Sequence, residues 1–99
     1  MNFNNFTIKS QEAVQEAVNL TRARGQQAID PAHLMAAVMK VGETVTGFLF
    51  QKLGVNGQQI AMLVDRQIES LPKVSGGEPY LSRESNEVLQ RAVELSKEM

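Results

Sequence analysis

One stretch of this chain has the glycine spacing of a phosphate-binding loop. Gly42 and Gly47 enclose four residues, as the glycines of a P-loop do. Phe48 and Leu49 replace the lysine and the hydroxyl residue that would hold the phosphates and the metal. No predicted strand precedes the motif. We therefore interpret this stretch as a turn that breaks a helix, and we expect no cofactor in these 99 residues.

The single histidine, His33, is the other residue with catalytic potential. A nucleophile needs a base beside it and a metal needs several ligands, but the chain has no cysteine and its acidic residues are dispersed. His33 lies three positions after Asp30, at the predicted start of a helix. We predict a structural hydrogen bond there, no metal site and no enzyme activity for this chain.

Composition excludes further classes of function. The formal net charge is -1 and the basic residues are scattered, whereas sequence-independent nucleic-acid binding requires a clustered basic face. No stretch approaches the ~18 apolar residues that span a bilayer, and the N-terminus lacks the segments of a signal peptide. Since there is also no cysteine for a disulfide, we expect a cytoplasmic protein that binds neither nucleic acid nor membrane.

Apolar residues recur with helical periodicity along the whole chain. Helices are predicted at residues 8–24, 31–41, 44–52, 57–71 and from 83 onward. Their capping residues are Thr7, Asp30, Asn56 and Ser82. No segment alternates with period two for long enough to indicate a strand, so we predict an all-α fold. The centre of its core is predicted at Leu34, Val38, Phe48, Leu49, Ile60, Leu63, Val64 and Ile68.

An internal repeat relates the two ends of the chain. Residues 6–24 align without gaps with residues 81–99, a shift of 75 positions, and 6 of the 19 positions are identical. The identical pairs are Ser10/Ser85, Glu12/Glu87, Gln15/Gln90, Ala17/Ala92, Val18/Val93 and Leu20/Leu95. Such a repeat indicates a duplicated helical unit that buries its apolar face against its copy. The predicted division is a first repeat at residues 1–72, a linker at 73–81, and the opening helix of a second, truncated repeat at 82–99.

Two motifs resemble a known family. FTxxSxxA begins at residue 6 and opens the first helix, and QxIDPxHLMxAV begins at residue 27 and opens the second. Together with LGVN at 53–56 and LPKV at 71–74, they resemble the amino-terminal domain of Clp-type AAA+ unfoldases, most closely the ClpB disaggregase branch. The resemblance covers essentially the whole chain. It implies a double-repeat helical bundle, here with the first four-helix repeat and one helix of the second.

The resemblance also implies a function. Such a domain is a substrate-docking module that binds exposed hydrophobic segments of unfolded or aggregated proteins. The whole protein would be a stress-response chaperone, a homohexameric ATPase that uses ATP and magnesium and works with a DnaK-type chaperone. In the family, clients bind in a groove between the repeats. The matching positions are Thr7, Leu89, Arg91 and Leu95, with Arg91 in place of the apolar residue expected there.

Two alternative functions stay open at this point. A domain of the same kind in the protease-associated ClpA and ClpC branches docks a folded adaptor instead of an unfolded client. A purely structural role is the other alternative. The apolar face predicted on the last helix would then pair with a second copy of the chain and form a homodimer.

Overall fold

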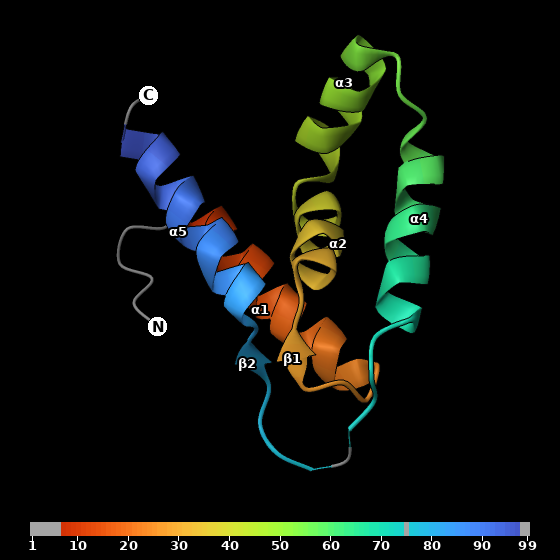
Figure 1. The fold of residues 1–99 in the computed structure, drawn as a ribbon. Coiled ribbons are helices and arrows are strands. Elements are labelled where there is room, and N and C mark those ends of the chain that lie inside the picture. Colours follow the sequence, from red (N-terminus) through yellow and green to blue (C-terminus); the bar gives the residue numbers. More distant parts are fainter. Residues whose placement is uncertain (1–6, 75, 98–99) are drawn as a thin grey trace.

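The computed structural model describes residues 7–74 and 76–97. Phe6 of the first motif and the end of the last predicted helix lie outside these ranges. The helices are α1 (Ile8–Ala23), α2 (Pro31–Val41), α3 (Glu43–Leu53), α4 (Gly57–Glu69) and α5 (Arg83–Lys97), and the strands are β1 (Ala28–Ile29) and β2 (Tyr80–Leu81) (Figure 1). The predicted all-α class is confirmed.

Side-chain caps fix the helix starts where the sequence predicts them. The Thr7 Oγ1 accepts a hydrogen bond from the Ser10 backbone N–H at 3.1 Å, and a carboxylate oxygen of Asp30 accepts one from Ala32 at 2.9 Å. Each bond satisfies a backbone donor that has no partner inside its helix. Gly54 ends α3 at a φ of 71°, a left-handed conformation that glycine adopts without steric cost.

A short parallel ladder joins β1 and β2. Ala28 lies beside Tyr80 and Ile29 beside Leu81, so segments 52 positions apart in the sequence are paired. The prediction of no strand is therefore wrong: two residues per strand are too few to produce a visible alternation. Because β2 lies inside the predicted linker, the ladder holds the start of α5 against the preceding helices.

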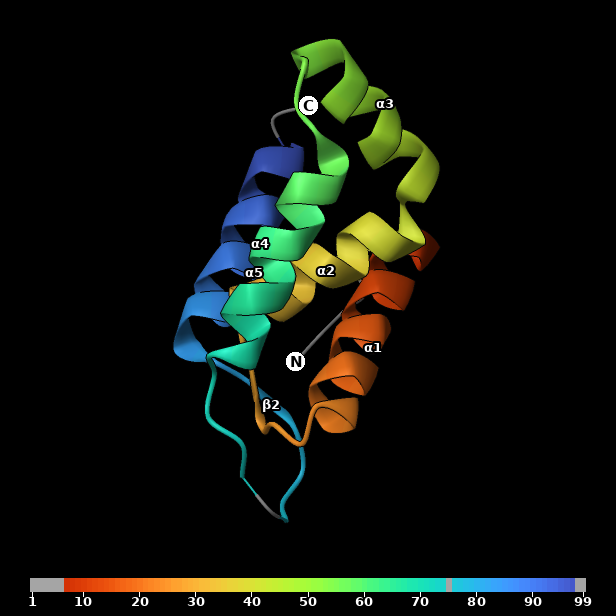
Figure 2. The same ribbon diagram turned by 90° about the vertical axis from the view of Figure 1, so that its right-hand side faces the viewer.

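The helices form an open arrangement around α2. It packs against α1, α3, α4 and α5, whereas α5 contacts α2 and β2. Seen from two directions, α1 and α5 run in opposite directions (Figures 1 and 2). The α3 helix extends away from α1 and packs against α2 and α4.

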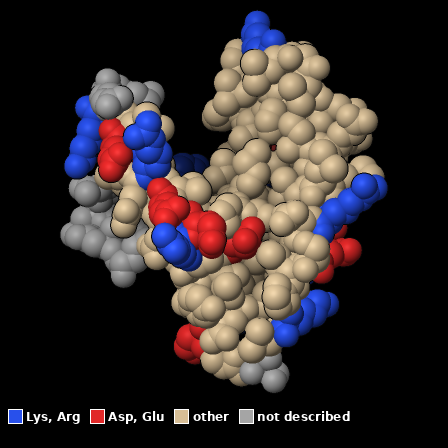
Figure 3. Space-filling view, in the orientation of Figure 1, with Lys and Arg blue, Asp and Glu red and all other residues tan. Residues whose placement is uncertain are grey.

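The core is smaller than predicted. Its buried apolar residues are Val14, Ala17, Ile29, Leu34, Ala37 and Ile68. Of the eight predicted core residues, these include only Leu34 and Ile68. Four others, namely Val38, Phe48, Leu49 and Leu63, are 45–62% exposed. They belong to an apolar face that the described residues leave uncovered, and Figure 3 shows a broad uncharged surface over α2, α3 and α4.

Candidate functional site

The histidine belongs to a buried polar network. The Nδ1 of His33 accepts a hydrogen bond from the Asp30 backbone N–H at 3.0 Å, which places the ring proton on Nε2. That Nε2 donates to the Gln26 Oε1 at 2.7 Å. The predicted structural hydrogen bond at His33 is confirmed. With both ring nitrogens engaged, the imidazole is held neutral and in one tautomer.

Gln26 extends this network to α4. Its Nε2 donates to the Ile68 carbonyl at 2.7 Å and lies 3.3 Å from the Leu71 carbonyl. Burial lowers the pKa of His33; the Asp30 carboxylate opposes this shift and the Arg24 guanidinium adds to it. The network therefore stabilises the junction of α1, α2 and α4, and its polar atoms are occupied by one another.

The glycine motif covers the α2–α3 junction and the first half of α3. Gly42 lies between α2 and α3, as the turn interpretation predicts, and Gly47 lies within α3. Within residues 7–74 and 76–97, no three His, Cys, Asp or Glu side chains gather into a group that could hold a metal ion. No helix in the same ranges combines the length and the apolar character needed to cross a membrane.

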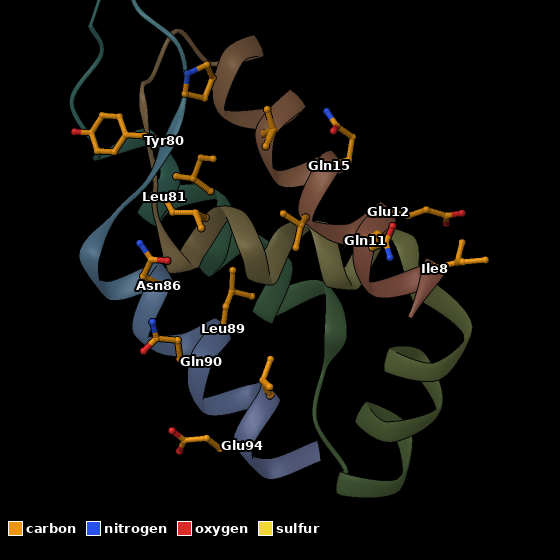
Figure 4. A pocket seen from close by; sticks show the side chains of 15 residues that line it. Ile8, Gln11, Glu12, Gln15, Tyr80, Leu81, Asn86, Leu89, Gln90 and Glu94 are labelled. Atoms are coloured by element: carbon orange, nitrogen blue, oxygen red, sulfur yellow. The ribbon is translucent and has the colours of Figure 1, made fainter. Parts of the chain in front are cut away.

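An open groove of about 1170 Å³ lies between α1 and α5 (Figure 4). We call it the amide-lined groove. Its apolar lining residues are Ile8, Val14, Val18, Ile29, Pro79, Leu81, Leu89 and Val93. Four side-chain amides also line it, two from each helix: Gln11 and Gln15 from α1, and Asn86 and Gln90 from α5. Tyr80 and Leu81 lie toward one end, and Glu94 lies toward the other.

A second groove of about 480 Å³ lies between the first half of α1, α2 and α5. We call it the apolar groove. Its lining residues are Thr7, Ser10, Ala13, Val14, Pro31, Leu34, Met35, Val38, Val88, Leu89, Ala92, Val93 and Ser96. Figure 3 shows the molecule hollowed between α5 and the uncharged surface over α2. Val14, Leu89 and Val93 line both grooves.

The repeat explains why α5 has an uncovered apolar face. On α1, Ala17 is fully buried at the face that packs on α2, whereas its equivalent Ala92 on α5 is exposed. Val88 and Leu95, on the same face of α5, are 47% and 46% exposed. The face of α5 that corresponds to the packing face of α1 thus lacks a covering helix among the described residues.

The four residues predicted from the resemblance lie at different places in the structure. Thr7 and Leu89 both line the apolar groove, and Leu89 also lines the amide-lined groove. Arg91 lines neither groove, and its guanidinium lies 3.5 Å from the Glu94 carboxylate on the exposed side of α5. Leu95 lines neither groove. The amides that line the larger groove were not among the predicted site residues, although the repeat alignment pairs Gln15 with Gln90.

The comparisons with known proteins all point to one protein family. Residues 5–99 match the family model described as the Clp repeat (R) N-terminal domain. The chain is 80% identical over 99 residues to chaperone protein ClpB of Bacteroides thetaiotaomicron and 62% identical to that of Porphyromonas gingivalis. It is 37% identical over 93 residues to chaperone protein ClpB 2 of a Nostoc species. The first two matches cover the whole chain, and the Nostoc match covers 92% of it. The chain itself spans only 11–12% of the length of these relatives.

Proposed function

Because this chain belongs to the family of Clp repeat N-terminal domains, we propose that it is the client-docking module of a ClpB-type disaggregase. Its ligands would be exposed hydrophobic segments of unfolded or aggregated proteins. ATP and magnesium, a hexameric assembly, a DnaK-type partner and a cytoplasmic location would be properties of the whole protein.

The amide-lined groove carries this proposal. An unfolded client exposes apolar side chains together with backbone N–H and C=O groups that have lost their partners. Apolar lining residues such as Leu81 and Leu89 can pack against the apolar side chains of the client. Amides such as Gln90 can form hydrogen bonds with its backbone N–H and C=O groups. A primary amide both donates and accepts, so it serves any client sequence. Ordering a flexible client costs free energy, which keeps the affinity low enough for release.

The apolar groove fits a packing role better than a client-docking role. It includes Ala92, whose equivalent on α1, Ala17, is fully buried in the core with Leu34 and Ala37 of α2. By the repeat, the natural occupant of this face is a helix with the apolar pattern of α2. In a two-repeat domain, the second repeat would supply that helix. Client docking is then left to the amide-lined groove.

Titration with an unfolded protein tests the proposal. Reduced, carboxymethylated lactalbumin has no fold and serves as the probe, and folded lactalbumin is the control. The Gln15→Ala/Gln90→Ala double variant should bind the unfolded probe about three- to tenfold more weakly, the effect of losing one or two modest hydrogen bonds. Gln51→Ala/Gln58→Ala, on exposed positions of α3 and α4, should leave the affinity unchanged. Equal affinity for both lactalbumin forms contradicts a preference for unfolded clients.

Dimerisation is the second candidate function, favoured by the uncovered face of α5. Val88, Ala92 and Leu95 form this face, and a second copy could cover it. Sedimentation equilibrium across a concentration series measures the association directly. A monomeric mass up to high micromolar concentration, unchanged in Leu95→Glu, contradicts this candidate.

A further inference from the structure

Residues that are equivalent in the internal repeat line both sides of the amide-lined groove. Gln15 on α1 and Gln90 on α5 are equivalent under the 75-residue shift, and so are Gln11 and Asn86. All four residues line the groove. Figure 4 places Gln15 and Gln90 on opposite sides of the groove, and Gln11 and Asn86 likewise on opposite sides. Each amide position on one helix therefore has its counterpart across the groove.

The apolar lining at the centre of the groove follows the same relation. Val14 is equivalent to Leu89, and Val18 is equivalent to Val93; all four line the groove. Equivalent residues on two antiparallel helices exchange places under a half-turn about an axis that passes between the helices. Since α1 and α5 run in opposite directions, the groove has an approximate two-fold axis through its centre (Figures 2 and 4).

The approximate two-fold symmetry of the groove allows an extended polypeptide to bind in two opposite directions. A half-turn about an axis perpendicular to an extended chain reverses its N-to-C direction but keeps the side chains alternating between its faces. Side-chain amides donate and accept equally well, so a reversed backbone meets the same partners. A helical ligand satisfies its own backbone groups and would gain nothing from these amides. The lining thus suits an extended segment.

We propose that the amide-lined groove binds an extended apolar segment of an unfolded polypeptide in either chain direction. This inference rests on the proposed client-docking function and specifies how the client lies. It suits a module that captures exposed segments of unrelated proteins, because such segments present no fixed polarity to the groove.

The ends of the groove are less alike than its centre. Tyr80 lies toward one end, while Glu94 lies toward the other with Glu12 on the facing helix (Figure 4). Glu12 pairs with Lys9 at 3.6 Å and Glu94 pairs with Arg91 at 3.5 Å, so charged side chains gather at this end of the groove. A charged peptide terminus would therefore impose a direction of its own. The test peptide must therefore be apolar, acetylated at its N-terminus and amidated at its C-terminus.

Paramagnetic relaxation enhancement tests the proposal on the 99-residue chain. A blocked apolar peptide carries a nitroxide at its first residue in one sample and at its last residue in another. Amide signals of Tyr80 and Asn86 report one end of the groove, and those of Ile8 and Glu94 report the other. Either label should broaden both ends to a similar extent. Broadening of one end by the first label and of the opposite end by the second overturns the inference while leaving client docking intact.

Two matched variants provide an independent check. Gln15→Ala and Gln90→Ala remove equivalent amides. The Gln15 Nε2 donates to the Asn19 Oδ1 at 3.1 Å, which leaves its second N–H and its Oε1 for a ligand. Each variant should therefore weaken peptide binding, while Gln58→Ala should have no effect. A loss for only one of the pair contradicts two-fold equivalence. If the blocked peptides cause no shift changes at any concentration, the proposed function itself fails, and the inference fails with it.

Discussion

The Nε2 of His33 donates a 2.7 Å hydrogen bond to the Oε1 of Gln26, and both side chains are at least 95% buried. The opposite ring nitrogen accepts from the Asp30 backbone N–H. A second proton on the ring would place a donor against that N–H. The fold therefore favours the neutral imidazole, and two predictions follow from this arrangement.

The stability of the fold should depend on pH through His33. Burial lowers its pKa, with Asp30 opposing and Arg24 reinforcing the shift. The unfolded histidine takes up a proton near pH ~6.5, whereas the folded one does so at lower pH. The free energy of unfolding should thus be fully retained above pH ~6.5 and fall as the pH drops through the folded pKa. Urea unfolding between about pH 7.5 and 5 measures this loss. The same slope in His33→Gln would contradict the assignment.

Gln26→Ala should destabilise the fold by about 1–3 kcal/mol, because the buried His33 Nε2–H loses its acceptor and the Ile68 carbonyl keeps the Leu71 backbone N–H as a donor. Gln27→Ala is the matched control. The Gln27 amide donates to the Glu78 carbonyl at 3.3 Å on the exposed surface, and its loss should cost no more than about 0.5 kcal/mol. Denaturant unfolding of both variants checks the prediction, and equal losses would exclude the network as the cause.

Ile68 and Leu63 lie on the same helix and should respond differently to truncation. Ile68 is 1% exposed and Leu63 is 62% exposed. Ile68→Ala should cost about 2–5 kcal/mol, since it leaves a cavity in the core, while Leu63→Ala should stay within about 0.5 kcal/mol. Thermal and urea unfolding measure both. A large loss at Leu63 would show that this face is covered in solution, for example in a dimer.

The equivalent serines Ser10 and Ser85 offer another comparison. The Ser85 hydroxyl is fully buried and donates to the Ile29 carbonyl, so it ties α5 to β1, whereas Ser10 is exposed. Ser85→Ala should destabilise the fold by about 1–3 kcal/mol and increase hydrogen exchange in α5. Ser10→Ala should change stability by less than about 0.5 kcal/mol. Similar losses at the two positions would contradict the anchoring role of Ser85.

The helices could be predicted from the sequence because their signals are local. The caps at Thr7, Asp30 and Asn56 and the glycine after α3 lie next to the boundaries that they fix. The β1–β2 ladder could not be predicted, since two-residue strands leave no pattern and their pairing is distant in the sequence. Periodicity also shows which face of a helix is apolar, but not whether another element covers it. Phe48 and Leu63 are exposed for that reason.

The candidate site could be predicted only in part. Leu89 follows from the family resemblance and lines both grooves. The amides were accessible in principle, because the repeat alignment pairs Gln15 with Gln90. Their place in one groove depends on the antiparallel orientation of α1 and α5, which the alignment does not contain. Arg91 shows the same limit of prediction from sequence. It follows Gln90 directly, but its side chain lines neither groove.

The most direct test of client docking in the amide-lined groove is a map of chemical shifts. The ¹⁵N-labelled chain is titrated with reduced, carboxymethylated lactalbumin, and the backbone signals are followed. The account predicts progressive shifts at Leu81, Asn86 and Gln90, with Phe48 and Leu49 on α3 unchanged. Shifts confined to α3 or to Met35 and Val38 of the apolar groove would contradict it.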